Sequence, residues 1–137
     1  MKIAPTPKTA KRRGSELSAA ANACADEDSA GLLLFYAAEC LLKALYMRQN
    51  GLQNTDHATL AAGPARQFVH RLDSLIRAIK IPPKDLKPSP GDISLRGGGA
   101  INVDQLHQAW RYGEKVAEHQ PACAWLRAVI AYAQARL

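Results

Sequence analysis

The sequence predicts an all-α domain, a bundle of four to five helices. Three observations carry this prediction. Apolar residues recur at helical spacing in five segments, capping and helix-ending residues stand at the borders of these segments, and the alternating pattern of a strand is almost absent. A chain of 137 residues, 47% of them hydrophobic, has the usual size of one domain and can bury a single core. We expect a helical bundle over residues 15–137, preceded by a disordered basic arm over residues 1–14.

The basic arm holds most of the excess charge. The net charge is +6, but Lys2, Lys8, Lys11, Arg12 and Arg13 all precede residue 14, which leaves 13 basic against 12 acidic residues. Such an arm attracts phosphates without fixed geometry, so Lys8, Lys11, Arg12 and Arg13 are candidate nucleic-acid contacts. A solvated terminus that binds nothing is the alternative interpretation.

The first helix is expected to begin at Ser15, whose hydroxyl suits an N-cap. The segment after it repeats small apolar residues at i, i+3, i+4 and i+7, which places one stripe toward a core. The stripe consists of Leu17, Ala20, Ala21 and Cys24.

The second helix is expected over residues 30–49, with a cap at Asp28 or Ser29 and an end at Asn50 and Gly51. Leucines surround its cylinder, so it should lie at the centre of the bundle or offer a second apolar face to a partner chain. Glu39 and Lys43 fall in its middle and would be costly in lipid, so we expect no membrane span. Their i, i+4 spacing predicts an ion pair on the helix.

A third amphipathic helix is expected from Phe68 to Ile79, where Pro82 and Pro83 follow. The connection over residues 81–101 is dense in proline and glycine and shows no periodic apolar pattern, which is typical of a functional or mobile loop. Its triplet Gly97 to Gly99 lacks the context of a P-loop and is interpreted as a hinge.

Two further helices complete the expected bundle. Asn102 and Gln105 form a capping-box pattern that opens a fourth helix, and Pro121 suits the first turn of a fifth. Both helices carry apolar stripes, so Trp110 and Trp125 are expected in the core. The stripes consist of Val103, Leu106, Trp110, Gly113 and Ala117 in the fourth helix, and Trp125, Leu126, Val129, Ile130 and Tyr132 in the fifth.

Three segments together resemble the HEPN (higher eukaryotes and prokaryotes nucleotide-binding) family. They are FYAAECLLKALYMRQNG at residues 35–51, HRLDSL at residues 70–75 and AWRYG at residues 109–113, in the order and spacing of that family. The resemblance implies an up-and-down bundle, frequently a homodimer, with a role in nucleotide, RNA, toxin–antitoxin or defence biology. It makes Glu39, Lys43, Arg111 and Tyr112 candidate ligand or partner contacts.

The ribonuclease members of that family carry an arginine, roughly four to six residues and then a histidine, because histidine can move a proton while arginine stabilises charge on the phosphate. This sequence departs from that spacing. Arg66 and His70 have three residues between them, and Arg111 and His119 have seven. The first pair would share a helical face, whereas the second would be about two turns apart.

Each candidate also has a structural interpretation. Arg111 would bond a carboxylate such as Glu39 inside the bundle, since a buried arginine needs a partner. His70 would be satisfied by a backbone carbonyl at the start of a helix, and His57 would be exposed on a loop.

Three functional hypotheses follow. The preferred one is a non-catalytic HEPN-like interaction module that binds a nucleotide or a partner protein, such as a nucleotidyltransferase or a defence or mobile-element component. The first alternative is a divergent metal-independent ribonuclease in which Arg66, His70, Arg111 or His119 act. The second is a nucleic-acid-binding bundle that uses the basic arm.

The three cysteines bear on the compartment. They lie in apolar segments without CxxC spacing, which favours reduced thiols over disulfides or a zinc site. We therefore expect a cytoplasmic protein with no metal and no cofactor.

Overall fold

The computed structural model describes residues 3–137, and this part of the chain is mainly helical. It contains five α-helices and one two-stranded sheet, and 59% of it is helical, which confirms the all-α class. The α-helices are α1 (Pro7–Ala23), α2 (Glu27–Gln49), α3 (Leu72–Ile79), α4 (Leu106–Arg111) and α5 (His119–Arg136). The short elements are the 3-10 helices η1 (Ala65–Phe68) and η2 (Val103–Gln105) and the antiparallel strands β1 (Ile93–Ser94) and β2 (Ala100–Ile101).

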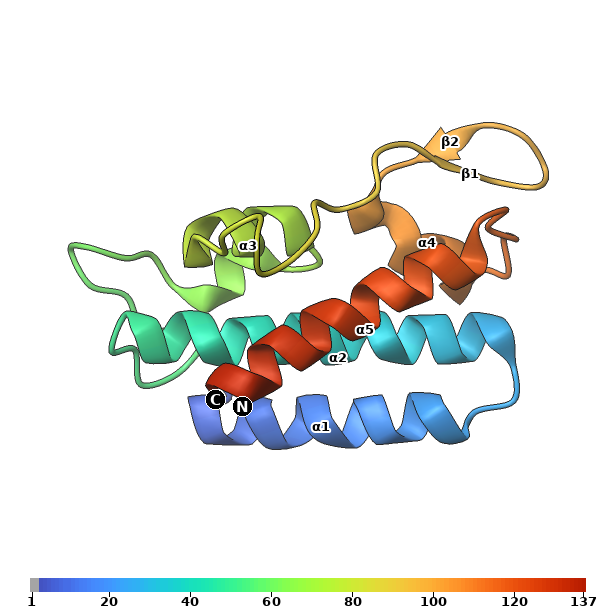
Figure 1. Ribbon diagram of the computed structural model, residues 1–137. Coiled ribbons are helices and arrows are strands. Elements are labelled where there is room, and N and C mark those ends of the chain that lie inside the picture. The colour runs from blue at the N-terminus through green and yellow to red at the C-terminus, as the bar shows by residue number, and fades with distance from the viewer. Residues whose placement is uncertain (1–2) are drawn as a thin grey trace.

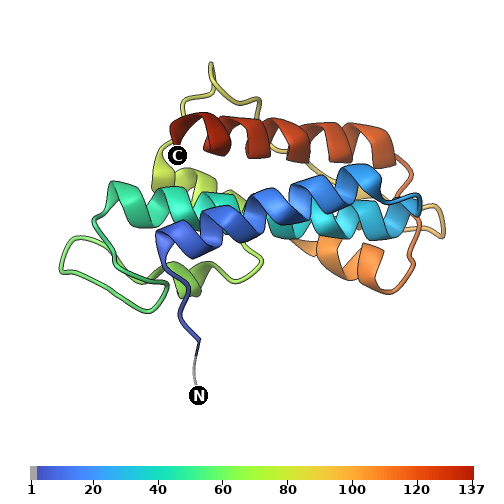
Figure 2. The ribbon, with the colours of Figure 1, turned by 90° about the horizontal axis from the view of Figure 1, so that it is seen from below.

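Helix α2 is the centre of the domain, as its apolar sequence predicts. Figure 1 shows α1 on one side of α2, α3 and α4 on the opposite side, and α5 crossing in front of it. Seen from below in Figure 2, α1 runs along α2 in the reverse direction. Because α2 is covered from several sides, residues all around it, from Leu34 to Met47, are buried.

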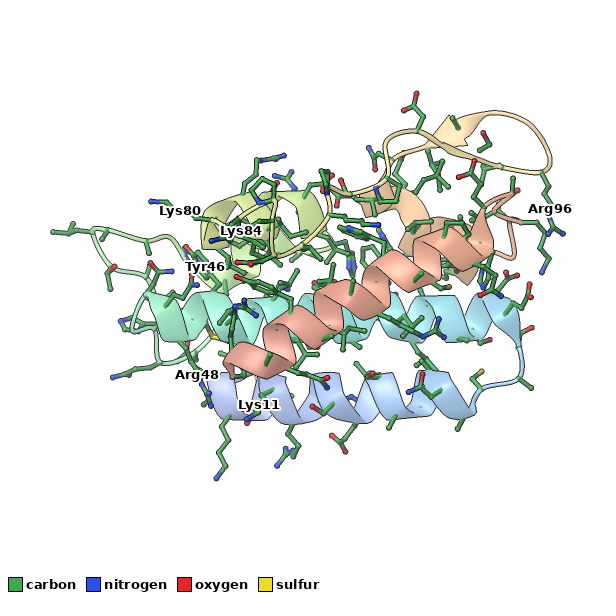
Figure 3. The ribbon with its side chains drawn as sticks, viewed as in Figure 1. Lys11, Tyr46, Arg48, Lys80, Lys84 and Arg96 are labelled. Atoms are coloured by element: carbon green, nitrogen blue, oxygen red, sulfur yellow. The ribbon has the colours of Figure 1, made fainter. Side chains whose placement is uncertain are left out.

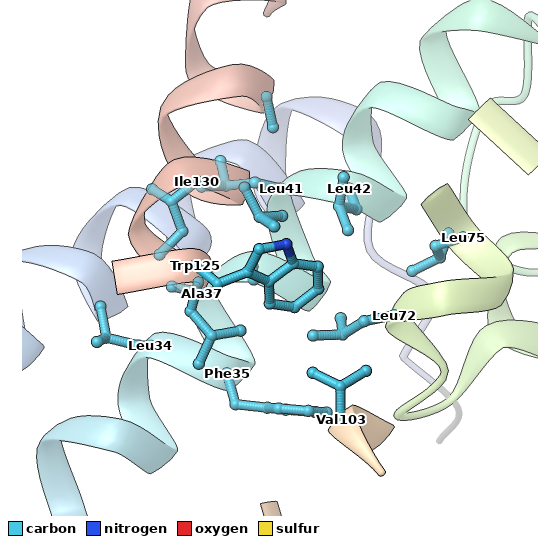
Figure 4. Packing of buried hydrophobic residues seen from close by; sticks show 14 of the residues in the cluster. Leu34, Phe35, Ala37, Leu41, Leu42, Leu72, Leu75, Val103, Trp125 and Ile130 are labelled. Carbon is cyan, nitrogen blue, oxygen red and sulfur yellow. The ribbon is translucent and has the colours of Figure 1, made fainter. Parts of the chain in front are cut away.

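The hydrophobic core joins α2 to every other long element. Figure 4 shows Trp125 of α5 gathered with Leu41 of α2, Leu72 of α3 and Val103 of η2. Trp110 and Trp125 are both buried, as predicted. Burial of such side chains contributes about 1.5–3 kcal/mol each before the entropy cost, so this cluster accounts for much of the folding free energy.

Two glycines let helices approach α2 closely. A Cβ atom on Gly14 of α1 would lie 2.6 Å from Leu41 Cγ, and one on Gly31 of α2 would lie 2.6 Å from Trp110 Cε2. No side chain larger than hydrogen fits at either position without movement of its neighbour. Gly14 therefore sets the α1–α2 distance, and Gly31 makes room for α4.

The N-cap of the first helix lies nine residues earlier than predicted. Thr6 is its N-cap and accepts a hydrogen bond from the Thr9 amide at 3.2 Å, and Pro7 occupies the first helical position. Threonine followed by proline is a good helix start, and the cationic residues after it are themselves good helix formers. Residues 7–14 are therefore the first half of α1 and not part of a disordered arm, and the Ser15 cap is wrong.

Other boundaries differ as well. Helix α2 begins at Glu27, capped by Asp26, one turn before the predicted start. The predicted third helix is split into η1 and α3 by residues 69–71. The Asn102–Gln105 capping box is confirmed. Helix α4 ends at Arg111 and Gly113 adopts a φ of +74°, so the predicted stripe ends at Trp110, about two turns before Ala117. The connection over residues 81–101 contains the β1–β2 hairpin.

Among the described helices, α2 is long and apolar enough to cross a membrane by length and composition, with a hydropathy of 1.5 over its best window. The structure buries 67% of that window inside the domain. The central helix of a folded core meets the same criterion, so this property is weak evidence for a span.

Candidate functional site

The polar centre of the molecule is Glu39, a carboxylate on the otherwise apolar helix α2. Its side chain is only 9% exposed. Lys43, one turn further along α2, donates to Oε2 at 2.7 Å, which confirms the predicted i, i+4 ion pair. His70 lies on the other side, with its amide donating to Oε2 at 3.2 Å and its Nδ1 at 2.8 Å from Oε1.

Glu39 fixes the orientation and tautomer of His70. His70 has a φ of +55°, in the left-handed region that non-glycine residues rarely adopt. The two contacts to one carboxylate hold this strained backbone in place. A carboxylate can only accept, so the proton of neutral His70 is on Nδ1 and the lone pair is on Nε2.

The pKa of Glu39 shows that it is ionised. Burial by itself raises this pKa, but the charge of Lys43 and the hydrogen bonds from Lys43 and His70 outweigh burial and hold it below its ordinary value. The carboxylate therefore carries its charge at neutral pH.

A second histidine stacks on the first. The rings of His70 and His107 are 4.1 Å apart between centroids and are inclined by 30°. His107 is buried, and its Nδ1 donates to the carbonyl of Asp104 at 2.7 Å. Burial, followed by electrostatic repulsion from the neighbouring His70 and Arg111, lowers the pKa of His107, so the neutral ring is favoured.

Asp104 brings these two histidines together. Helix α3 has no capping side chain of its own, and the Asp104 carboxylate of η2 accepts instead from the amides of Leu72 at 2.9 Å and Asp73 at 3.4 Å. This bond between distant segments satisfies the first orphan amides of α3 and places His70, just before α3, against His107, just after η2. Burial, the largest cause, raises the pKa of Asp104.

The exposed edge of the site is formed by an arginine between two tyrosines. Arg111, at the end of α4, donates to the Tyr36 hydroxyl, and this hydrogen bond is the largest cause that raises the pKa of its guanidinium, with a smaller contribution from the neighbouring Tyr112. Tyr36 also lies beside His70, with 5.8 Å between ring centroids. Tyr112 is 76% exposed. We call Tyr36, Glu39, Lys43, His70, His107 and Arg111 the His70 cluster.

The structure corrects several expectations for these residues. Arg111 is exposed and bonds Tyr36 and not Glu39, because the buried carboxylate is already occupied by Lys43 and His70. His70 bonds this carboxylate and not a backbone carbonyl. Arg66 lies in η1, before the non-helical residues 69–71, and pairs with Asp56 at 3.4 Å, so it does not share a helical face with His70.

The other two histidines have separate roles. His119 accepts from Trp110 Nε1 at 3.2 Å and lies 3.4 Å from Cys123 Sγ, so no hydrogen bond of the described residues joins it to the His70 cluster. His57 is half-buried and not exposed, because its Nδ1 accepts from the Gln53 amide at 2.8 Å.

The predicted nucleic-acid residues lie on helix α1. Lys8, Arg12 and Arg13 are exposed, whereas Lys11 is half-buried and donates to the carbonyl oxygen of Leu137 at 3.3 Å. Arg48 donates to the same oxygen at 2.8 Å, and Figure 3 shows Lys11 and Arg48 at the end of the molecule where α5 finishes. Lys11 is thus a link between α1 and α5.

Two members of the His70 cluster, Tyr36 and His107, were not predicted. Tyr36 is three residues before Glu39 on α2, so helical spacing alone places both on one face. His107 gives no comparable signal, since its position depends on the bond from Asp104 to α3. Within residues 3–137, no group of three His, Cys, Asp or Glu residues is placed to hold a metal ion.

Comparison of the chain with protein-family models, curated proteins and solved structures finds no match.

Proposed function

We propose that this chain is a HEPN-like, non-catalytic binding module whose His70 cluster holds a nucleotide or an RNA phosphate. The observation that carries the proposal is the position of Arg111. Its guanidinium is exposed at the end of α4, donates to the Tyr36 hydroxyl, and adjoins the ring of His70 through Tyr36. An oriented guanidinium is well suited to bind phosphate through paired hydrogen bonds.

Tyr112 supports a nucleotide over a free phosphate. Its ring is largely exposed, directly beside Arg111 in the chain. A base can stack on such a ring while the phosphate reaches the guanidinium, and stacking of this kind contributes about 1–3 kcal/mol per base. The three HEPN-like segments also support the proposal, because Glu39, Lys43, His70, Arg111 and Tyr112 all fall within them.

Binding is tested by fluorescence anisotropy of labelled single-stranded RNA and of labelled mononucleotides in EDTA. We expect Arg111→Ala to weaken binding about tenfold or more, because a hydrogen bond to a charged group contributes about 1.5–3 kcal/mol. Arg96→Ala is the matched control, since Arg96 is exposed on the hairpin connection. Equal affinities of wild type and Arg111→Ala would contradict the proposal. A larger loss of affinity in the double variant Lys8→Ala/Arg12→Ala than in Arg111→Ala would favour the alternative, in which nucleic acid binds along α1.

A divergent metal-independent ribonuclease is the second candidate, and one observation favours it. Glu39 fixes His70 with a free lone pair on Nε2, which is the arrangement of a carboxylate-oriented general base. In this role Nε2 of His70 would take the proton of a ribose 2′-hydroxyl, and Arg111 would stabilise the phosphate.

Cleavage of a labelled RNA pool in EDTA separates the two candidates. Activity that is lost in both His70→Ala and Arg111→Ala but retained in His57→Ala and Arg96→Ala establishes the ribonuclease. If the RNA stays intact although the wild-type protein is folded and binds it, the result supports the non-catalytic module. Cleavage that is equal in all variants comes from a contaminating nuclease.

The homodimer and a nucleotidyltransferase or other protein partner stay predictions. Light scattering coupled to size-exclusion chromatography measures the mass of the protein in solution. A mass of one chain at high protein concentration contradicts the homodimer.

A further inference from the structure

A second site lies between α1, α2 and the segment that leads to η1. It is a cavity of about 280 Å³, and its wall includes Ala10 and Arg13 of α1, Cys40 and Lys43 of α2, Arg66 of η1 and Val69. Backbone hydrogen bonds build its rim, because the Thr55 amide donates to the Pro5 carbonyl and the Arg66 amide donates to the Thr55 carbonyl, both at 3.0 Å. The cavity is therefore preformed by the fold. We call it the Arg13 pocket.

Three cations from three elements surround the Arg13 pocket, and they differ in how far they are neutralised. Lys43 is paired with Glu39 at 2.7 Å. Arg66 has a longer contact of 3.4 Å to Asp56, and its side chain is 53% exposed. Arg13 makes no hydrogen bond or ion pair with any residue of the range 3–137. The pocket therefore has one uncompensated guanidinium at its wall.

The charges of the wall also act on Cys40, which lines the same pocket. Burial is the largest influence and, with Glu39, raises the pKa of the Cys40 thiol, whereas the positive charges of Lys43 and Arg13 oppose this shift. The two charges that act on the thiol belong to residues of the same wall. The raised pKa also means that Cys40 is a thiol and contributes an apolar surface.

The rest of the wall is mainly apolar, with Pro5, Ala10 and Val69 among its residues. A volume of about 280 Å³ is at the lower end of the range for ligand sites and suits a molecule with one ring. We propose that the Arg13 pocket binds a small organic oxyanion, a carboxylate or phosphate monoester on a single-ring or short aliphatic body, with its charged group on Arg13. This site is separate from the proposed phosphate site at Arg111.

Lys43 connects the two sites. It lines the Arg13 pocket and also donates to the carboxylate that orients His70. An oxyanion in the pocket competes with Glu39 for this ammonium group. Ligand binding in the Arg13 pocket therefore changes the hydrogen bonding of the carboxylate that orients His70.

The test is a titration of isotope-labelled protein followed by amide NMR shifts. The probes are phenyl phosphate, phenylacetate and the neutral phenethyl alcohol, which distinguish a phosphate, a carboxylate and the ring alone. We expect saturable shifts at the amides of Arg13, Thr55 and Val69 with the two anions, and dissociation constants on the order of 1 mM for ligands of this size. The Arg13→Ala variant should weaken binding about tenfold.

Arg12→Ala is the matched control, because it removes the same charge from the neighbouring residue, which does not line the pocket. Val69→Glu is a second variant at a half-exposed position, where an added carboxylate should abolish anion binding without unfolding the domain. Equal weakening by Arg12→Ala and Arg13→Ala, or equal binding of phenethyl alcohol, overturns the proposal. Absence of saturable shifts at these amides overturns it as well. Nucleotide binding is a separate test. If it is lost in Arg111→Ala and kept in Arg13→Ala, this result supports the proposed function at Arg111 and does not bear on the Arg13 pocket.

Discussion

Removal of the Glu39 carboxylate is expected to destabilise the domain strongly. Glu39→Ala leaves the Lys43 ammonium without its partner, at a side chain that is only 15% exposed. It also removes the acceptor of two His70 contacts, which offset a left-handed backbone that costs on the order of 1–3 kcal/mol. Breaking a buried ion pair costs about 3–5 kcal/mol, and the partial exposure of Lys43 and His70 places this variant at the lower end, near 3 kcal/mol.

The expected loss converts into a large change in melting temperature. A chain of 137 residues has an unfolding entropy of about 0.29 kcal/mol/K, so a loss of about 3 kcal/mol lowers Tm by about 10 °C. Thermal unfolding followed by circular dichroism measures this shift. The control is Glu16→Ala, which removes an exposed carboxylate from α1 and should change stability by less than about 0.5 kcal/mol.

A double-mutant cycle tests the part of this loss that comes from His70. Because Glu39 holds the left-handed backbone, His70→Gly should cost more in the wild type than in Glu39→Ala, where glycine relieves an unsupported strain. A Tm for Glu39→Ala that equals that of Glu16→Ala would refute the reasoning, as would strict additivity in the cycle.

Three further predictions concern the frame of the site. Asp104→Ala removes the cap of α3 and should cost about 1–2 kcal/mol in urea unfolding, whereas Asp104→Asn should retain most of it. Gly31→Ala places a Cβ atom 2.6 Å from Trp110 and should cost about 1–3 kcal/mol, whereas Gly91→Ala, where nothing lies within 4 Å, should be nearly neutral. Burial lowers the pKa of His107 below 6.5, so its contribution to stability is present above that pH and is lost as pH falls through the lower folded-state pKa. Stability measured against pH should show this loss in the wild type and a flatter profile in His107→Gln.

The elements that depend on local signals were predicted well. The apolar cylinder of α2, the Asn102–Gln105 capping box and the Glu39–Lys43 pair all follow from spacing within one helix. The start of α1 also had a local signal, Thr6 followed by Pro7, but the cationic run after it was interpreted as a mobile arm. In the structure this run is the exposed face of a helix whose other face packs on α2.

The geometry of the site depends on contacts that spacing does not reveal. The left-handed backbone at His70 is held by a carboxylate 31 residues earlier, and His107 is placed by the bond from Asp104 to α3. No helical pattern contains this information, because each contact joins separate segments. The sequence therefore predicts Glu39, His70 and Arg111 as candidates and Lys43 as the partner of Glu39, but it gives wrong partners for His70 and Arg111.

The central claim is that Glu39 orients His70 toward a bound phosphate ligand, and nitrogen-detected imidazole NMR tests it most directly. In alkaline buffer, we expect neutral His70 to carry its proton on Nδ1 and its Nε2 resonance to shift when a mononucleotide is added. Glu39→Gln should lose this tautomer preference, and Arg111→Ala should lose the shift. A proton on Nε2 of His70 in the wild type, or an Nε2 resonance unmoved by saturating nucleotide, would contradict the account.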